Sequence, residues 1–123
     1  MKILGLRAHG YLDYVAVAGF LAAPSLISFA GLPAMIAYAL ACVHLLLTLT
    51  TAFPLGILRL VPFTAHGAIE LVVAIALALL PWLLGFSGDP APRNFYAGAG
   101  AVLFLVWLTT DYRAEALPPP RRP

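Results

Sequence analysis

Four long apolar stretches dominate the chain, and short segments rich in glycine, proline and polar residues separate them. The stretches cover approximately residues 10–30, 33–53, 63–86 and 95–110. A helix needs about 20 mostly apolar residues to cross a hydrocarbon layer of about 30 Å, and each stretch is near that length. None of them alternates apolar and polar positions as a barrel strand would, so their backbone groups must be satisfied within helices. The pattern predicts four transmembrane helices.

Turn residues group these four helices into two hairpins. The sequence Gly-Leu-Pro at 31–33 separates the first pair, and Ser-Gly-Asp-Pro-Ala-Pro at 87–92 separates the last pair. Both segments combine glycine with proline, which mark turns and not helix interiors. We therefore predict an all-α polytopic membrane protein in which residues 1–123 form a single membrane domain. The expected architecture is a four-helix bundle built from two tandem, pseudo-symmetric helical hairpins.

Composition agrees with a chain surrounded by lipid. Of its 123 residues, 63% are hydrophobic and 10% are charged, whereas soluble domains carry about 25% charged residues. The single cysteine, Cys42, can form neither an internal disulfide nor a thiolate metal cluster. A net charge of +2 without a basic stripe argues against nucleic acid as a partner. We expect the lipid bilayer as the main partner, with other membrane proteins or a second copy of the chain as candidate protein partners.

Basic residues are distributed unequally between the two sides that this topology creates. With four spans, both termini and the central loop share one side. The only basic residue in the two hairpin loops on the other side is Arg93. Because Lys and Arg are retained in the cytoplasm, we expect a multi-pass protein of the inner or plasma membrane with both termini cytoplasmic. Residues 113–123 are expected to form a short Pro/Arg-rich cytoplasmic tail near anionic headgroups. The basic residues on this side are Lys2, Arg7, Arg59, Arg113, Arg121 and Arg122.

An internal repeat relates the two predicted hairpins. The sequence His-Gly-Tyr-Leu-Asp at 9–13 matches His-Gly-Ala-Ile-Glu at 66–70, an offset of 57 residues from 9 to 66. At the same offset Pro24 aligns with Pro81. The second helix of each unit matches with two extra residues, which pairs Thr-Thr at 50–51 with Thr-Thr at 109–110 and Phe53 with Tyr112. We predict repeat units at 9–53 and 66–112, related by a pseudo-two-fold axis along the membrane normal.

A cleaved signal peptide is the alternative interpretation of the first apolar stretch, because Lys2 and Arg7 precede it. Asp13 interrupts the run, however, and the same segment recurs later in the chain, where cleavage would make no sense. We therefore expect the first stretch to be retained.

The end of the third stretch carries a motif. Pro-Trp-Leu-Leu-Gly-Phe at 81–86, followed by Ser-Gly, resembles the SPW repeat family of small bacterial integral membrane proteins, which have two repeats of two transmembrane helices. The chain departs from the family name by placing Leu80 before the proline and Ala-Pro-Ser at 23–25. The resemblance implies a membrane location and the repeated hairpin fold, and it implies no activity. The repeat-motif residues are Pro24, Pro81, Trp82, Gly85 and Phe86.

Proline and tryptophan suit these positions on physical grounds. A proline within a membrane helix removes one backbone hydrogen bond and kinks the helix, so Pro24 and Pro81 are expected to tilt the ends of their helices. An indole can keep its apolar body in lipid and its N–H in water, so Trp82 is expected in the outer headgroup belt.

Ionisable residues within the apolar stretches form a candidate intramembrane polar cluster of His9, Asp13, His44, His66 and Glu70. A spacing of four places His9 with Asp13, and His66 with Glu70, on one helical face each. His44 lies about 13 Å from the cytoplasmic end of the second helix, and Glu70 lies at about 12 Å on the third helix at 1.5 Å per residue. Because these depths agree, we predict a hydrogen bond or an ion pair between His44 and Glu70.

The cluster permits several interpretations. The first is structural, in which the polar groups fix the packing of the hairpins through interhelical hydrogen bonds. The alternatives are a haem or metal site that uses histidine, or a proton or ion relay. We predict no cofactor, because the spacing of the histidines and carboxylates matches no specific metal motif. The sequence also has no nucleophile elbow, no paired catalytic carboxylates and no Gly-rich phosphate loop, which argues against enzymatic activity. The favoured function is a small integral membrane protein with a structural or partner-binding role.

Small residues predict that the fourth helix packs closely against another helix. The sequence Ala-Gly-Ala-Gly-Ala at 97–101 follows no strand, so it is not a nucleotide-binding loop. Small side chains let helix backbones approach closely. A matching surface in the first helix is formed by Ala16, Ala18, Gly19, Ala22 and Ala23.

Overall fold

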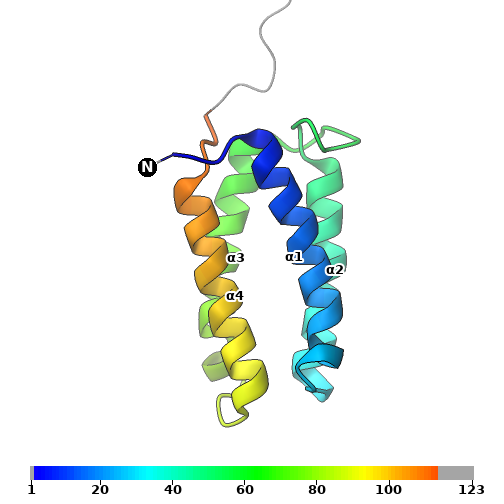
Figure 1. The fold of residues 1–123 in the computed structure, drawn as a ribbon, viewed down its shortest axis with the longest axis vertical. Coiled ribbons are helices and arrows are strands. Elements are labelled where there is room, and N and C mark those ends of the chain that lie inside the picture. Colours follow the sequence, from blue (N-terminus) through cyan, green and yellow to red (C-terminus); the bar gives the residue numbers. More distant parts are fainter. Residues whose placement is uncertain (1, 114–123) are drawn as a thin grey trace, which may run out of the picture.

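The computed structural model describes residues 2–113 and consists of four helices (Figure 1). Each helix has 20 or 21 residues, which corresponds to about 30 Å at 1.5 Å per residue. The described residues contain two isolated β-bridges and no strand. The all-α prediction is therefore confirmed. The helices are α1 (Leu6–Leu26), α2 (Gly31–Thr50), α3 (Phe63–Leu83) and α4 (Pro90–Thr109).

The helices pack as two hairpins that stand side by side. α1 packs mainly against α2, and α3 packs mainly against α4. The two short hairpin loops lie at one end of the bundle, whereas the N-terminal segment, the α2–α3 connection and the end of α4 lie at the other (Figure 1). We call these the loop end and the terminal end.

The bounds of the two hairpins correspond to each other. α3 begins and ends 57 residues after α1, from 6 to 63 and from 26 to 83. α4 begins and ends 59 residues after α2, from 31 to 90 and from 50 to 109. At the terminal end, two backbone bridges cross between the hairpins in the same relation: Leu4 pairs with Thr110, and Val61 pairs with Thr51. The segment that precedes each hairpin is thus attached to the end of the other hairpin.

Two helix starts differ from the sequence-based expectation. α1 begins at Leu6, so His9 lies within the helix and not before it. α4 begins at Pro90, several residues before the apolar stretch at 95–110. A proline at the first helical position loses no intrahelical hydrogen bond, which explains why α4 extends into the polar segment. The predicted tail at 113–123 lies outside the described residues except for Arg113.

The repeat-motif prolines lie in the last turns of their helices. Both are buried, and the chain turns into the left-handed region four residues later, at Ser28 (φ 59°) and Gly85 (φ 79°). Phe86 packs on Tyr96 with ring centroids 5.6 Å apart, and Trp82 is 57% exposed. The motif therefore shapes the loop end of the bundle and lies far along the helices from the polar cluster.

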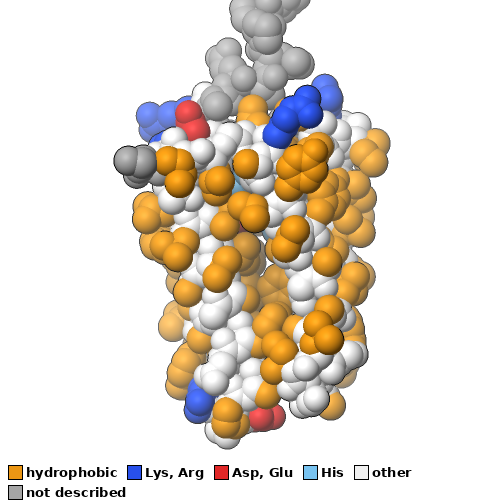
Figure 2. Space-filling view, in the orientation of Figure 1, with side chains coloured by type: hydrophobic (Ala, Val, Ile, Leu, Met, Phe, Trp, Pro, Cys, Tyr) orange, Lys and Arg blue, Asp and Glu red, His pale blue; other side chains and the backbone are white. Residues whose placement is uncertain are grey.

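The surface between the two ends is apolar. Large hydrophobic side chains cover it, while Lys and Arg side chains are seen at the ends (Figure 2). Two helices, α2 and α3, are long and apolar enough to cross a membrane, each with a mean hydropathy of 2.0. The other two carry more polar residues, notably His9 and Asp13 in α1 and Arg93 and Asn94 in α4.

Candidate functional site

The five residues of the predicted polar cluster lie together near the terminal end, between the hairpins. His9, Asp13, His66 and Glu70 are almost completely buried, and the side chain of His44 is 11% exposed. α1 contributes His9 and Asp13 from one face, and α3 contributes His66 and Glu70 from the equivalent face. The i, i+4 spacing thus brings both histidine–carboxylate pairs to one centre.

Contacts between the hairpins are as short as those within each helix. His9 Nε2 lies 3.2 Å from Asp13 Oδ1 and 3.2 Å from Glu70 Oε2. His66 Nε2 lies 3.3 Å from Asp13 Oδ2 and 4.0 Å from Glu70 Oε2. The two Nε2 atoms are 3.4 Å apart. One set of four side chains therefore connects α1 to α3.

Two threonines fix the orientation of the imidazoles, and sequence reasoning paired them in the repeat without assigning this role. His9 Nδ1 lies 2.9 Å from Thr110 Oγ1, and His66 Nδ1 lies 2.8 Å from Thr51 Oγ1. Each threonine follows the last residue of its helix, and each serves the histidine of the other hairpin. The sequence signal was the pairing of the two Thr-Thr dipeptides.

The hydroxyl protons of these threonines are already used, which determines the histidine tautomer. Thr51 Oγ1 donates to the carbonyl of Leu47 at 2.6 Å, and Thr110 Oγ1 donates to that of Val106 at 2.6 Å. A hydroxyl has one proton, so each Oγ1 must accept from the imidazole. Nδ1 therefore carries a proton in both rings, and Nε2 of a neutral ring presents its lone pair to the centre of the cluster.

The predicted bond between His44 and Glu70 is wrong. His44 Nε2 lies 3.4 Å from Asp13 Oδ1 instead. Depth along the bundle was estimated correctly, but depth does not determine lateral position. Because α2 packs mainly against α1, the carboxylate that His44 reaches is Asp13. The equivalent position in α4 is Leu103, so the third imidazole breaks the pseudo-symmetry.

Tyr112 belongs to the cluster, although the sequence analysis noted it only as the counterpart of Phe53. Its hydroxyl donates to Glu70 Oε2 at 2.5 Å. Burial, together with the Glu70 carboxylate, raises the pKa of Tyr112 above its usual range, so the hydroxyl remains a donor. The ring lies against Gly67, where an added Cβ would come within 2.7 to 2.9 Å of it. Gly67 thus leaves the space that Tyr112 fills.

Aromatic rings cover the cluster at the terminal end. Phe63 lies against His9 at a centroid distance of 5.3 Å, and it also contacts Tyr112 at 4.9 Å and Phe53 at 5.8 Å. Phe53 and Phe63 are both buried. This cover excludes water and lowers the local dielectric, which strengthens the interactions among the charged groups.

Several polar atoms of the cluster have no hydrogen-bond partner among the described residues. They are Asp13 Oδ2, Glu70 Oε1 and His44 Nε2. Over residues 2–113, the basic groups within 4.0 Å of Asp13 and Glu70 are all imidazoles. Three other ionisable residues near this end lie outside the cluster: Tyr11 is exposed, Tyr14 donates to a backbone carbonyl, and Asp111 accepts from the Arg113 amide.

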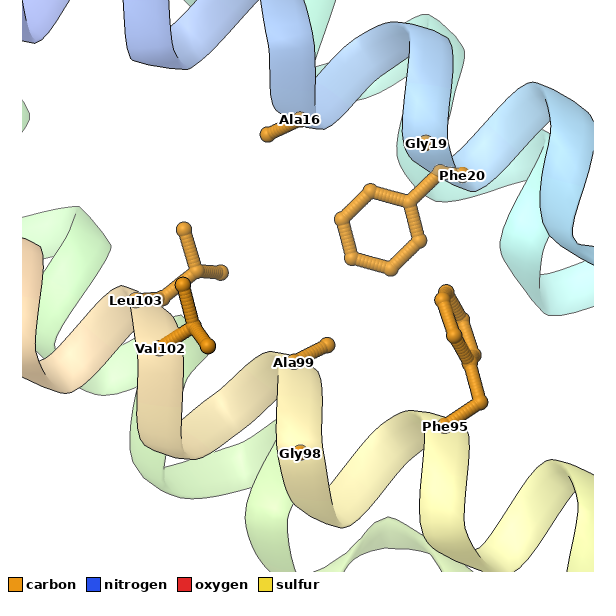
Figure 3. A pocket seen from close by; sticks show the side chains of 8 residues that line it. All are labelled: Ala16, Gly19, Phe20, Phe95, Gly98, Ala99, Val102 and Leu103. Carbon is orange, nitrogen blue, oxygen red and sulfur yellow. The ribbon is translucent and has the colours of Figure 1, made fainter.

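An apolar groove separates α1 from α4 beside the cluster, and its lining is drawn in Figure 3. It has a volume of about 360 Å³, and Gly19 and Gly98 both face open space there. The small residues of α1 and α4 therefore do not meet closely across this groove. The close approach occurs between α3 and α4, because a Cβ at Gly100 would lie 2.5 to 2.8 Å from backbone atoms of Ala78 and Ala74.

A smaller cavity of about 110 Å³ adjoins the cluster. Asp13 and Glu70 both belong to its lining, and it shares Ala16, Val102 and Leu103 with the groove. The space between α1 and α4 therefore leads toward the two carboxylates.

Chemically, the cluster offers nitrogen and oxygen ligands at close range. One atom each from His9, Asp13, His66 and Glu70 can be chosen so that all four lie within 4.8 Å of one another. Comparison of the chain with protein-family models, with curated proteins and with solved structures finds no match.

Proposed function

We propose that this chain is an integral membrane protein with four transmembrane spans and a structural or partner-binding role. The observation that carries the proposal is the segregation of side chains. Large hydrophobic residues face outward along helices about 30 Å long, while the ionisable residues of the same segments face the centre. Polar groups in a membrane protein are expected to face the bundle interior in this way.

The proposal extends to α1 and α4, which are less apolar than α2 and α3. Each is paired along its length with an apolar partner helix of nearly the same length. The polar residues that lower the hydropathy of α1, His9 and Asp13, are buried between the hairpins and do not face lipid. Arg93 lies in the first turn of α4, at the loop end, where it can reach the interface.

We propose that the protein lies in the inner or plasma membrane of the cell and that both of its termini are cytoplasmic. Lys2, Arg7 and Arg59 lie at the terminal end of the bundle, whereas Arg93 and Asp89 lie at the loop end. This asymmetry supports the orientation through the positive-inside rule.

The structural role rests on how the hairpins are joined. The helix backbones approach most closely within each hairpin, and side chains from both hairpins share one core that holds the two together. The polar cluster does so near the terminal end, and Tyr96 does so at the loop end by donating to the Pro33 carbonyl at 2.7 Å. We infer that the paired hairpins form a small membrane scaffold. We also propose membership of the SPW repeat family, on the Pro-Trp-Leu-Leu-Gly-Phe segment at 81–86.

Cysteine accessibility in intact cells tests the topology. The native Cys42 is exposed and is first replaced in a Cys42→Ala background. Single cysteines at Ser28 and Ser87, in the hairpin loops, should react with a membrane-impermeant maleimide added outside. A cysteine at Leu58, in the α2–α3 connection, should react only after permeabilisation and is the matched control. External labelling at Leu58 would contradict the orientation, and labelling at one hairpin loop only would contradict four spans.

A further inference from the structure

We infer that the two hairpins bind one divalent transition-metal ion, with zinc the best match, through His9 Nε2, His66 Nε2, and the carboxylates of Asp13 and Glu70. The inference goes beyond the scaffold role, which requires no metal. It rests on the ligand spacing, on the hydrogen bonds behind the imidazoles and on the charge of the cluster.

The shortest distances between candidate ligand atoms match those of a tetrahedral site. Zinc binds imidazole nitrogen and carboxylate oxygen at about 2.0 to 2.1 Å, so neighbouring ligand atoms of a tetrahedron lie about 3.3 Å apart. The two Nε2 atoms are 3.4 Å apart, and the contacts of His9 Nε2 with the two carboxylates are both 3.2 Å. His66 Nε2 lies 3.3 Å from Asp13 and 4.0 Å from Glu70. The two imidazoles contact different oxygens of Asp13, and one ligand atom from each residue lies within 4.8 Å of the other three, so Asp13 must turn one oxygen toward both rings when an ion binds.

The threonines provide the outer-shell hydrogen bonds that a metal-binding imidazole needs. A ligating histidine usually donates its second ring N–H to an oxygen, which fixes the tautomer and the ring plane. Thr110 and Thr51 accept such bonds from His9 and His66 at 2.9 and 2.8 Å. Since each threonine proton is used by a backbone carbonyl, both rings are oriented with Nε2 as the ligand atom. The arrangement occurs twice, once for each hairpin.

Charge balance favours a cation at this centre. With neutral imidazoles, the two buried carboxylates would carry a charge of −2, because neither contacts a Lys or Arg in the described chain. Asp13 Oδ2 and Glu70 Oε1 also have no hydrogen-bond partner there. Burying uncompensated charge is costly, and a divalent ion would neutralise the pair. Two extra protons on the Nε2 atoms are the competing arrangement, and the experiment below distinguishes it.

The ligand types narrow the choice of metal. Two nitrogens with two carboxylates suit zinc, whereas magnesium and calcium prefer oxygen ligands in larger numbers. No cysteine lies in the cluster, which disfavours sites that select copper(I). A haem would require room for a macrocycle between the rings, and the cavity beside the carboxylates holds about 110 Å³. A single ion therefore fits better than a porphyrin.

An entry route is available from the terminal end. A surface cavity of about 640 Å³ is lined by Asp111, Tyr112 and Lys2, among others. Tyr112 also donates to Glu70, so its side chain links this cavity to the cluster. Movement of this one ring would bring an ion from the aqueous side to the carboxylates.

Metal binding is tested on the full chain purified in detergent, stripped with a chelator and titrated with Zn²⁺. We expect one zinc per chain by elemental analysis, and visible absorption typical of tetrahedral Co²⁺ after loading with cobalt. A chelator-stripped protein that remains monodisperse and binds no zinc would overturn the inference and would favour the protonated cluster. The topology experiment is independent of this result, so the scaffold proposal would stand.

The decisive variants are Thr51→Val and Thr110→Val. Each replaces the hydroxyl group that accepts from a histidine with a methyl group of similar volume. Loss of such a partner typically lowers metal affinity by about 10-fold to 100-fold, and we expect that loss with the stoichiometry unchanged. Thr50→Val and Thr109→Val are matched controls, because these hydroxyls bond the carbonyls of their own helices and touch neither histidine. Equal zinc affinities in Thr51→Val and Thr50→Val would refute the site. Zinc retained by the double variant His9→Gln with His66→Gln would also refute it.

Discussion

Substitution of Gly67 by alanine should disturb the polar cluster through Tyr112. An added Cβ would lie 2.7 Å from the Tyr112 ring, and an ordinary contact begins at 3.4 Å, so the ring must move by about 0.7 Å. That movement strains the 2.5 Å hydrogen bond from the hydroxyl to Glu70. Overpacking typically costs about 1 to 3 kcal/mol, and a hydrogen bond to a charged group is worth about 1.5 to 3 kcal/mol. Because the overpacking cost and the weakening of the hydrogen bond both apply in part, we expect Gly67→Ala to lower the free energy of unfolding by roughly 2 to 4 kcal/mol.

Equilibrium unfolding in mixed micelles measures this loss, with Gly98→Ala as the matched control. Gly98 is also helical, but a Cβ there meets nothing within 4 Å, so the control should be neutral or slightly stabilising because alanine favours helix. The loss should largely disappear when Gly67→Ala is combined with Tyr112→Ala, since the opposing ring is then absent. An equal loss with and without the Tyr112 ring would refute this reasoning.

Two further changes address the contacts that join the helices. Tyr96→Phe removes the hydroxyl that donates to the Pro33 carbonyl across the hairpins. It should lower the free energy of unfolding by about 1 kcal/mol in the same assay. A loss below the experimental error would show that this hydrogen bond contributes nothing. His44→Leu installs the residue found at the equivalent position, Leu103, and removes the contact with Asp13 and the ring contact with His66. It should leave the zinc stoichiometry at one per chain, and loss of the metal would make His44 essential to the site.

The periodic features of the site were predictable from sequence. A spacing of four residues places His9 with Asp13, and His66 with Glu70, on common helical faces. The repeat then implied that the two faces are equivalent, and two equivalent polar faces in an apolar chain must turn toward each other to avoid lipid. The all-α fold followed similarly from the length of the apolar stretches.

Lateral neighbours could not be predicted in this way. The depth of His44 was correct, but its partner depends on which helix α2 packs against, and that choice made Asp13 and not Glu70 the nearest carboxylate. The role of Thr51 was also not predictable. It lies at a helix end 15 residues before His66, and the two side chains come together only because the start of α3 packs back toward the end of α2. Such contacts depend on tertiary packing and leave no periodic signal.

Thr51 and Thr110 orient imidazoles from both hairpins so that each presents Nε2 to one shared centre. Nitrogen NMR of the zinc-loaded protein with ¹⁵N-labelled histidine tests it most directly, with His9→Gln and His66→Gln used to assign the rings. The account predicts that His9 and His66 each carry a proton on Nδ1 and a metal bond on Nε2, and that both signals change when zinc is removed. Protonated Nε2 in either ring of the zinc-loaded protein would contradict it.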